Sequence, residues 1–130
     1  MGWLSIEKIQ KLIDKYGSET YTKLKDPIFF INEIIGFKDE PYKLSIYQEE
    51  WLRLVDGTDY DRFNFAAFRS SGKTETLLID YPIFKAFTQT GWQGIITSNS
   101  QKQSISILRR IRETILGNEI LRTSVPSAKE

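Results

Sequence analysis

The stretch FNFAAFRSSGKT, which runs from Phe63 to Thr74, decides the expected fold. Its first half, residues 63–68, is a short apolar run that is long enough for a buried strand and too short for a helix. Its second half ends in Gly72-Lys73-Thr74 and matches the phosphate-binding motif G-x-x-x-x-G-K-S/T, except that Ala67 replaces the first Gly. A helical pattern follows. The stretch therefore predicts a strand, a phosphate-binding loop and a helix, in that order.

The residue types of this loop suit a polyphosphate. Gly72 allows the backbone N–H groups to approach phosphate oxygens closely, and the helix that follows adds its positive end. The Lys73 ammonium would neutralise the β- and γ-phosphates, and the Thr74 hydroxyl is a hard ligand for Mg²⁺. A chance Gly-Lys-Thr in a turn is the alternative, but the flanking strand and helix favour a nucleotide site. Its predicted residues are Arg69, Ser70, Ser71, Gly72, Lys73, Thr74 and Glu75, with ATP and Mg²⁺ as ligands.

Hydrophobic periodicity predicts the secondary structure of the rest of the chain. Helices are expected at residues 5–16, 27–36, 45–55, 73–89 and 100–117, and a second strand at 93–97. Pro82 is expected to kink or break its helix near Asp80 and Tyr81. This order predicts an α/β fold, a truncated P-loop parallel sheet with an α-helical N-terminal extension. Residues 1–57 would form the helical lead-in and residues 58–130 the partial ATPase core.

The last expected helix has an apolar stripe and a basic face. The predicted buried positions are Ile105, Leu108, Ile111 and Ile115. The basic positions are Lys102, Arg109, Arg110 and Arg112. A solvated surface is the favoured interpretation of the basic face, and a track for DNA phosphates is the alternative.

Gln48 stands at the start of a predicted helix, 25 residues before Lys73. A Gln upstream of a phosphate-binding loop can read the adenine edge with one donated and one accepted hydrogen bond. The sequence from Ser45 to Gln48 is also a capping box, in which the Gln48 side chain would bond the Ser45 backbone N–H. The residues alone leave both roles open.

Asp80 ends a run, Leu77-Leu78-Ile79-Asp80, that is similar to the Mg²⁺-binding strand of nucleotide hydrolases. It follows Lys73 by seven residues on the same predicted helix, about 10 Å further along the axis. Asp80 is therefore expected to point away from the phosphates and is not assigned to the metal.

Composition excludes several kinds of chemistry. The chain has no Cys and no His, which excludes disulfides, cysteine nucleophiles and Ser-His-Asp triads. Its formal net charge of +1 neither requires nor excludes a nucleic-acid partner. Because no apolar run approaches the ~20 residues of a membrane span, and residues 1–10 do not fit a signal peptide, neither a membrane nor secretion is expected.

Together these segments resemble the N-terminal ATPase part of the large terminase subunit, the motor that packages DNA into the proheads of tailed phages and related viruses. The resemblance covers about residues 20 to 121. The matching features are Pro27 to Ile31 with Gly36, Tyr47-Gln48 with Trp51, Arg69 ahead of Gly72-Lys73-Thr74, and Ile95 to Gln101.

The resemblance implies a P-loop ATPase that couples ATP hydrolysis to the translocation of double-stranded DNA. It implies that Gln48 belongs to the adenine-contacting motif, that Arg69 senses the γ-phosphate and acts with Lys73 in catalysis, and that Thr97 and Ser98 couple nucleotide state to DNA. The implied partners are double-stranded DNA, the portal, the small terminase subunit and further copies in a ring, all in the host cytoplasm.

One departure from the family concerns length. The family's Mg²⁺-binding Asp, catalytic Glu and nuclease domain lie further along the chain, so a fragment of the motor that hydrolyses little ATP is expected. A superfamily 2 helicase-like translocase shares the upstream Gln and a similar loop, although Arg69 and Ser70 replace its usual small residue and Gly. A helical interaction module that no longer binds nucleotide is the alternative outside the enzymes.

Overall fold

The computed structural model describes residues 4–36, 44–65 and 72–122. These ranges contain seven α-helices and two π-helical segments. The elements are α1 (Ile6–Tyr16), α2 (Thr20–Lys23), α3 (Pro27–Phe29), η1 (Phe30–Ile35), α4 (Ile46–Gly57), η2 (Thr74–Asp80), α5 (Tyr81–Thr88), α6 (Gln101–Leu116) and α7 (Glu119–Arg122).

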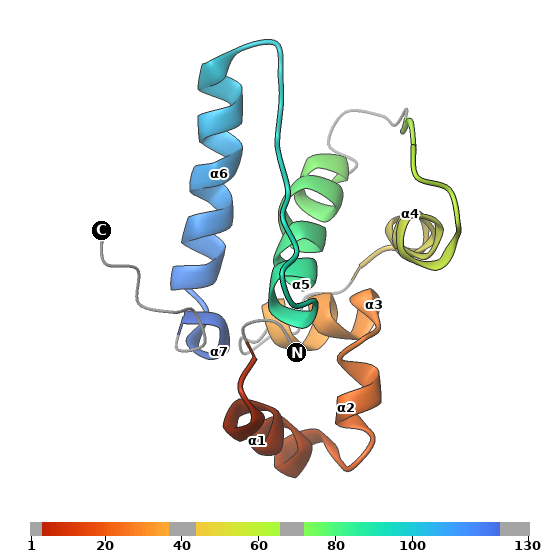
Figure 1. The fold of residues 1–130 in the computed structure, drawn as a ribbon, viewed down its shortest axis with the longest axis vertical. Coiled ribbons are helices and arrows are strands. Elements are labelled where there is room, and N and C mark those ends of the chain that lie inside the picture. The colour runs from red at the N-terminus through yellow and green to blue at the C-terminus, as the bar shows by residue number, and fades with distance from the viewer. Residues whose placement is uncertain (1–3, 37–43, 66–71, 123–130) are drawn as a thin grey trace.

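The helix formed by η2 and α5 is the centre of the arrangement. Figure 1 shows α6 standing beside this helix on one side and α4 lying on its other side. The first helices, α1 to α3, lie below, and η1 contacts both α5 and α7. The N-terminus of η2 is therefore placed between α4 and α6.

The main core lies where η1 meets α5. Phe30, Phe84 and Phe87 are buried there, and the Phe30 and Phe84 rings meet edge to face at 5.5 Å between centroids. Aliphatic side chains complete this core, namely Leu4, Ile9, Leu12, Leu24, Ile34, Ile79, Ile83 and Leu121. Full burial of each such side chain contributes about 1.5–3 kcal/mol to folding, so this cluster fixes the lower end of the η2–α5 helix.

The helix termini that were predicted from capping residues are confirmed. The Ser5 hydroxyl accepts a hydrogen bond from the Lys8 N–H, and the Asp26 carboxylate accepts one from the Ile28 N–H at 3.0 Å. Ser100 caps α6 in the same way, and α6 ends at Gly117. Because these caps act within a few residues, the sequence alone is enough to predict them.

The predicted parallel sheet is wrong: the described residues form helices and irregular segments, with no strand. Residues 63–65 and 93–97 are irregular, and the remainder of the first predicted strand, residues 66–68, lies outside the described ranges. Strands need a partner and a covered face, but Ile95 is 91% exposed. Phe65 instead packs edge to face on Trp51 of α4, with 6.0 Å between ring centroids. Within the described residues, the first apolar run makes a ring contact with α4, and neither run forms a strand.

The predicted stripe of α6 is also partly wrong. Ile105 and Leu108 are 46% and 54% exposed, whereas Ile107, Ile111 and Ile115 pack against the main core. These three positions repeat every four residues and share one face. The contact with η2 sets which face turns inward, and this contact joins elements that are distant in sequence.

The helix predicted at residues 73–89 forms, with a change where Pro82 was expected to disturb it. Its hydrogen-bond pattern is π-helical over η2 and becomes α-helical at Tyr81. Pro82 lies in the first turn of α5 and has no N–H to donate. The chain therefore changes helix type near Asp80 and Tyr81 instead of ending there.

Candidate functional site

Gly72 forms the junction between the predicted loop and η2. Its φ is +82°, in the left-handed region that favours glycine, and its carbonyl accepts a hydrogen bond from the Thr76 N–H at 2.9 Å. A Cβ at this position would overlap the Gln48 side-chain nitrogen. The positive φ favours Gly at position 72, directly before Lys73 and Thr74, and a side chain there would displace the end of the Gln48 side chain.

Lys73 and Thr74 lie on an open cavity of about 350 Å³ beside the start of η2. The Lys73 ammonium donates a hydrogen bond of 3.4 Å to the Phe65 carbonyl. The other lining residues are apolar or aromatic, and they are Val55, Phe63, Phe65, Leu77, Leu78 and Tyr81. The cavity thus has a cation and a hydroxyl from Lys73 and Thr74 and otherwise apolar walls.

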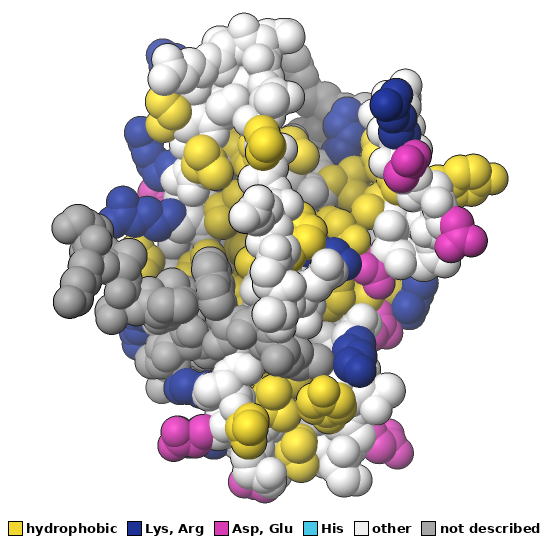
Figure 2. Space-filling view, in the orientation of Figure 1, with side chains coloured by type: hydrophobic (Ala, Val, Ile, Leu, Met, Phe, Trp, Pro, Cys, Tyr) yellow, Lys and Arg dark blue, Asp and Glu magenta, His cyan; other side chains and the backbone are white. Residues whose placement is uncertain are grey.

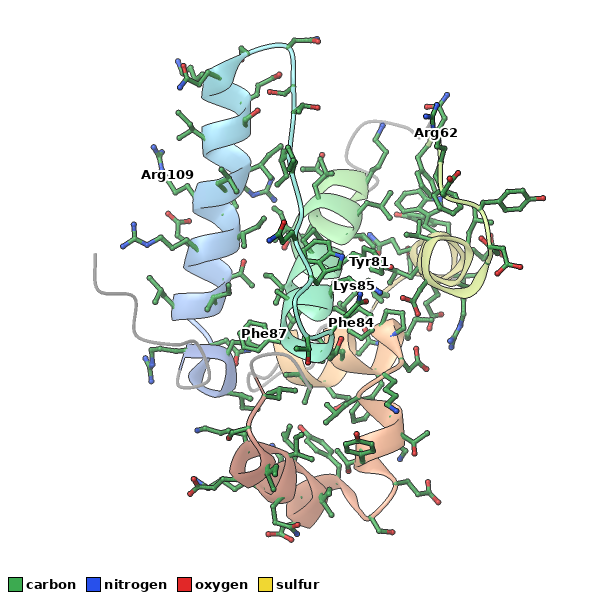
Figure 3. All side chains as sticks on the ribbon, viewed as in Figure 1. Arg62, Tyr81, Phe84, Lys85, Phe87 and Arg109 are labelled. Carbon is green, nitrogen blue, oxygen red and sulfur yellow. The ribbon has the colours of Figure 1, made fainter. Side chains whose placement is uncertain are left out.

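Tyr81 and Lys85 lie on the side of α5 that faces α4 (Figure 3), where both contact Asp56. The Tyr81 hydroxyl donates to Asp56 Oδ1 at 3.1 Å, and the Lys85 ammonium lies 3.8 Å from the same oxygen. Burial, and next the Asp56 carboxylate, raise the pKa of the Tyr81 phenol above its usual value. These contacts hold α4 and α5 together and fix one wall of the cavity.

Gln48 takes the capping arrangement that the sequence offered as one of its two roles. Its Oε1 accepts a hydrogen bond of 2.9 Å from the Ser45 N–H, and the side chain is only 7% exposed. Its Nε2 faces the Cα of Gly72. Gln48 is therefore brought next to the phosphate-binding motif, as expected, while its role in reading adenine remains a prediction.

Glu75 and Asp80 lie away from the cavity lining. Glu75 forms an ion pair with Arg110 of α6 at 2.5 Å. Asp80 is 1% exposed, and neither carboxyl oxygen has a hydrogen-bond partner in the described structure. Burial, and next the Glu75 charge, raise the pKa of Asp80 from 3.8 to about 8, while Arg110 acts in the opposite direction. The expectation that Asp80 does not face the phosphate-binding residues agrees with this placement.

The basic face of α6 is partly engaged. Figure 2 shows Lys and Arg side chains along the outer edge of this helix, with hydrophobic side chains between them. Arg110 is held by Glu75, whereas Lys102, Arg109 and Arg112 are exposed. This surface lies on the far side of α6 from the core contacts of Ile107 and Ile111.

The structure brings together Gly72, Lys73, Thr74 and Gln48, and it turns Glu75 toward α6. Arg69, Ser70 and Ser71 lie outside the described residues. Sequence reasoning missed the apolar walls of the cavity. Leu77, Leu78 and Tyr81 follow Thr74 at spacings that keep them on one helix face, and this pattern could have indicated them.

The described ranges contain no group of three or more acidic, His or Cys side chains that could hold a metal ion. No helix in the same ranges has the length and apolarity needed to cross a membrane. Comparison of the chain with protein-family models, curated proteins and solved structures finds no match.

Proposed function

We propose that the chain binds ATP and Mg²⁺ through residues 69–74, as the ATP-binding portion of a viral DNA-packaging terminase motor. One observation carries the nucleotide proposal. Gly72 adopts a positive φ directly before a helix, and Lys73 and Thr74 at that helix start share one open cavity. The motor function rests on the sequence resemblance. Double-stranded DNA, the portal, the small terminase subunit, a ring of copies and the host cytoplasm belong to the same proposal.

The chemistry of the helix start supports phosphate binding. The Thr76 N–H already donates to the Gly72 carbonyl, whereas the N–H groups of Thr74 and Glu75 come before the first acceptors of the helix, and the helix dipole favours an anion there. Among the described residues, the Lys73 ammonium donates a 3.4 Å hydrogen bond to a neutral carbonyl, which a phosphate oxygen would replace with a charge-assisted one. Thr74 supplies the hydroxyl that would complete the coordination of a phosphate-bound Mg²⁺.

We expect binding without appreciable hydrolysis by this chain. Phosphoryl transfer to water needs one acid that holds Mg²⁺ and a second group that orients the attacking water. Glu75 follows Thr74 directly but is paired with Arg110, and Asp80 is buried away from the cavity lining. Neither carboxylate is placed for either task. Turnover of about 1 s⁻¹ or more, lost on Lys73→Ala, would contradict this expectation.

The test is a calorimetric titration with ATP and Mg²⁺ of the wild type, Lys73→Ala and the control Lys102→Ala. A hydrogen bond to a charged group contributes about 1.5–3 kcal/mol, so Lys73→Ala should lower the affinity by roughly tenfold to a hundredfold. Lys102 is an exposed lysine on α6, and its removal should leave the affinity within about twofold. Equal affinities of all three proteins would overturn the proposal.

One alternative function has a specific observation in its favour. The described residues form helices without the sheet that normally supports a phosphate-binding loop, and the Lys73 ammonium already bonds a backbone carbonyl. A helical interaction module that binds no nucleotide fits these facts. The same titration distinguishes it, because such a module would give no saturable heat with ATP.

A further inference from the structure

We propose that the apolar part of the Lys73 cavity binds the nucleobase, by stacking, so that the ligand class is nucleoside triphosphates in general and not ATP alone. This inference rests on the proposed nucleotide function, because Lys73 and Thr74 would hold the phosphates. It adds a location for the base and a consequence for specificity. It also differs from the expectation that Gln48 reads adenine.

The cavity has two chemically different parts. Lys73 and Thr74 supply a cation and a hydroxyl, whereas α4 and η2 supply aliphatic walls through Val55, Leu77 and Leu78. Three aromatic residues, Phe63, Phe65 and Tyr81, also line it. A ligand that fits such walls has an anionic end and a flat, weakly polar end. A nucleoside phosphate has this combination.

The aromatic residues are held in place by their own contacts. The Phe63 and Phe65 rings are nearly parallel, with 26° between their planes and 6.2 Å between centroids. Phe65 also packs edge to face on Trp51, and the Tyr81 hydroxyl is bonded to Asp56. A base would therefore meet ordered ring surfaces, which lowers the entropy cost of binding.

The size of the cavity is compatible with this ligand. Its volume of about 350 Å³ lies within the ~300–1,000 Å³ that small-molecule sites usually have. It extends along η2 from Thr74 to Tyr81, a separation of at most about 10 Å along a helix axis. Phosphates bound at Lys73 would thus leave the base near Leu77 and Leu78.

Specificity follows from the polar groups near the cavity. Gln48 is nearly buried, and its Oε1 is bonded to Ser45. The Tyr81 hydroxyl is bonded to Asp56. Base recognition would therefore come from stacking, which every base can provide, and not from reading a hydrogen-bonding edge. ATP and GTP should bind with similar affinity.

The test compares ATP, GTP and inorganic tripolyphosphate, each with Mg²⁺, on the wild type and two pairs of variants. Phe63→Ala removes a cavity ring, and its control Tyr60→Ala removes a ring that is exposed in the same segment. Leu78→Ala removes part of a wall, and its control is Leu54→Ala on α4. Both leucines are partly exposed, at 38% and 41%, so thermal unfolding should change little.

We expect ATP and GTP to bind within about threefold of each other and roughly tenfold or more tighter than tripolyphosphate. Phe63→Ala should weaken ATP by about tenfold and leave tripolyphosphate unchanged, with a smaller loss for Leu78→Ala and none for the controls. Equal binding of ATP and tripolyphosphate, or a loss of ATP preference only in Gln48→Ala, would overturn the base site and leave the phosphate site standing. Absence of binding by all three ligands would overturn both proposals.

Discussion

The two π-helical segments, η1 and η2, differ in what they bury. η1 buries Phe30, Ile31 and Ile34, and its Ile34 carbonyl accepts a hydrogen bond of 2.7 Å from the Asn118 side chain. η2 buries Ile79 but also two polar residues, Thr76 and Asp80. The Thr76 hydroxyl and both Asp80 carboxyl oxygens lack hydrogen-bond partners within the described structure.

This difference makes η2 the stronger candidate for a functional segment. An unpaired buried polar group costs about 1–3 kcal/mol, so η2 carries a cost that the apolar burial of η1 does not. Departures of this kind are expected where a segment serves function. The other face of η2 lines the Lys73 cavity. Both segments share the π-helical geometry, so it does not distinguish them, whereas the unsatisfied polar groups and the cavity belong to η2.

The largest loss of stability from truncating one side chain is expected in η1. Phe30→Ala would remove a fully buried ring that packs on Phe84 and Phe87, and such truncations cost about 3–5 kcal/mol. Urea unfolding followed by circular dichroism measures this cost. Ile6→Ala is the control, because Ile6 is 87% exposed. A loss below about 1 kcal/mol for Phe30→Ala would remove the distinction between the two segments.

The second expected effect is a pH dependence of the free energy of unfolding, which arises from Asp80 in η2. Folding raises the pKa of Asp80 from 3.8 to about 8, so the folded chain holds a proton that the unfolded chain releases between these values. The protonated Asp80 carboxyl contributes fully to the free energy of unfolding below about pH 4. This contribution falls as the pH rises to about 8, and the free energy of unfolding then stays at its lower value. One proton changes the free energy of unfolding by at most about 1.4 kcal/mol per pH unit.

Asp80→Asn should remove this slope. Urea unfolding of the wild type and the variant, at several values between pH 4 and 8, gives the two slopes directly. Asp59→Asn, at an exposed aspartate in the irregular segment after α4, is the control. Parallel pH profiles of wild type and Asp80→Asn would show that the buried carboxyl does not distinguish η2 from η1.

A smaller loss of stability is expected from Gln48, whose side chain lies against Gly72 at the junction before η2. Gln48→Ala would remove the hydrogen bond to the Ser45 N–H at the start of α4, and the loss of a cap costs about 1 kcal/mol. The exposed Gln93→Ala is the control. Thermal unfolding measures the loss, and ATP titration measures base preference. A changed ATP-to-GTP ratio without loss of stability would instead return Gln48 to the role of adenine contact.

The smallest effect concerns the ion pair of η2 with α6. The Glu75 and Arg110 side chains are both partly exposed, and exposed pairs contribute about 0.2–1 kcal/mol. A double-mutant cycle with Glu75→Gln and Arg110→Gln should give a coupling in this range, and the coupling should fall in high salt. A coupling above about 2 kcal/mol would make this contact a major support of η2.

Sequence reasoning succeeded where the deciding interactions are local. Ser5, Asp26 and Ser100 act on backbone groups within a few residues, and each helix start that they indicated is present. Pro82 was expected to kink or break its helix, and the helix instead continues through it with a change from π- to α-helical hydrogen bonding. The prediction of a parallel sheet was wrong because strand pairing depends on partners that are distant in sequence. The apolar run that includes Phe63 and Phe65 specifies ring contacts, and Trp51 of α4 provides one of them.

The candidate site was predictable in part for the same reason. The motif itself located Gly72, Lys73 and Thr74, because a positive φ followed by a helix start is a local feature. The pairing of Glu75 with Arg110, 35 residues away, could not be inferred from spacing. The cavity depends on how α4 packs against η2, which no local pattern encodes.

The most direct measurement is a titration of the isotope-labelled chain with ATP and Mg²⁺, followed through the backbone amide resonances. If the start of η2 binds the phosphates, the amides of Gly72, Lys73 and Thr74 should shift most, and the shifts should saturate and disappear in Lys73→Ala. If those three amides stay unchanged while the largest shifts fall near Lys102 and Arg109 on α6, the nucleotide site proposed for η2 is wrong.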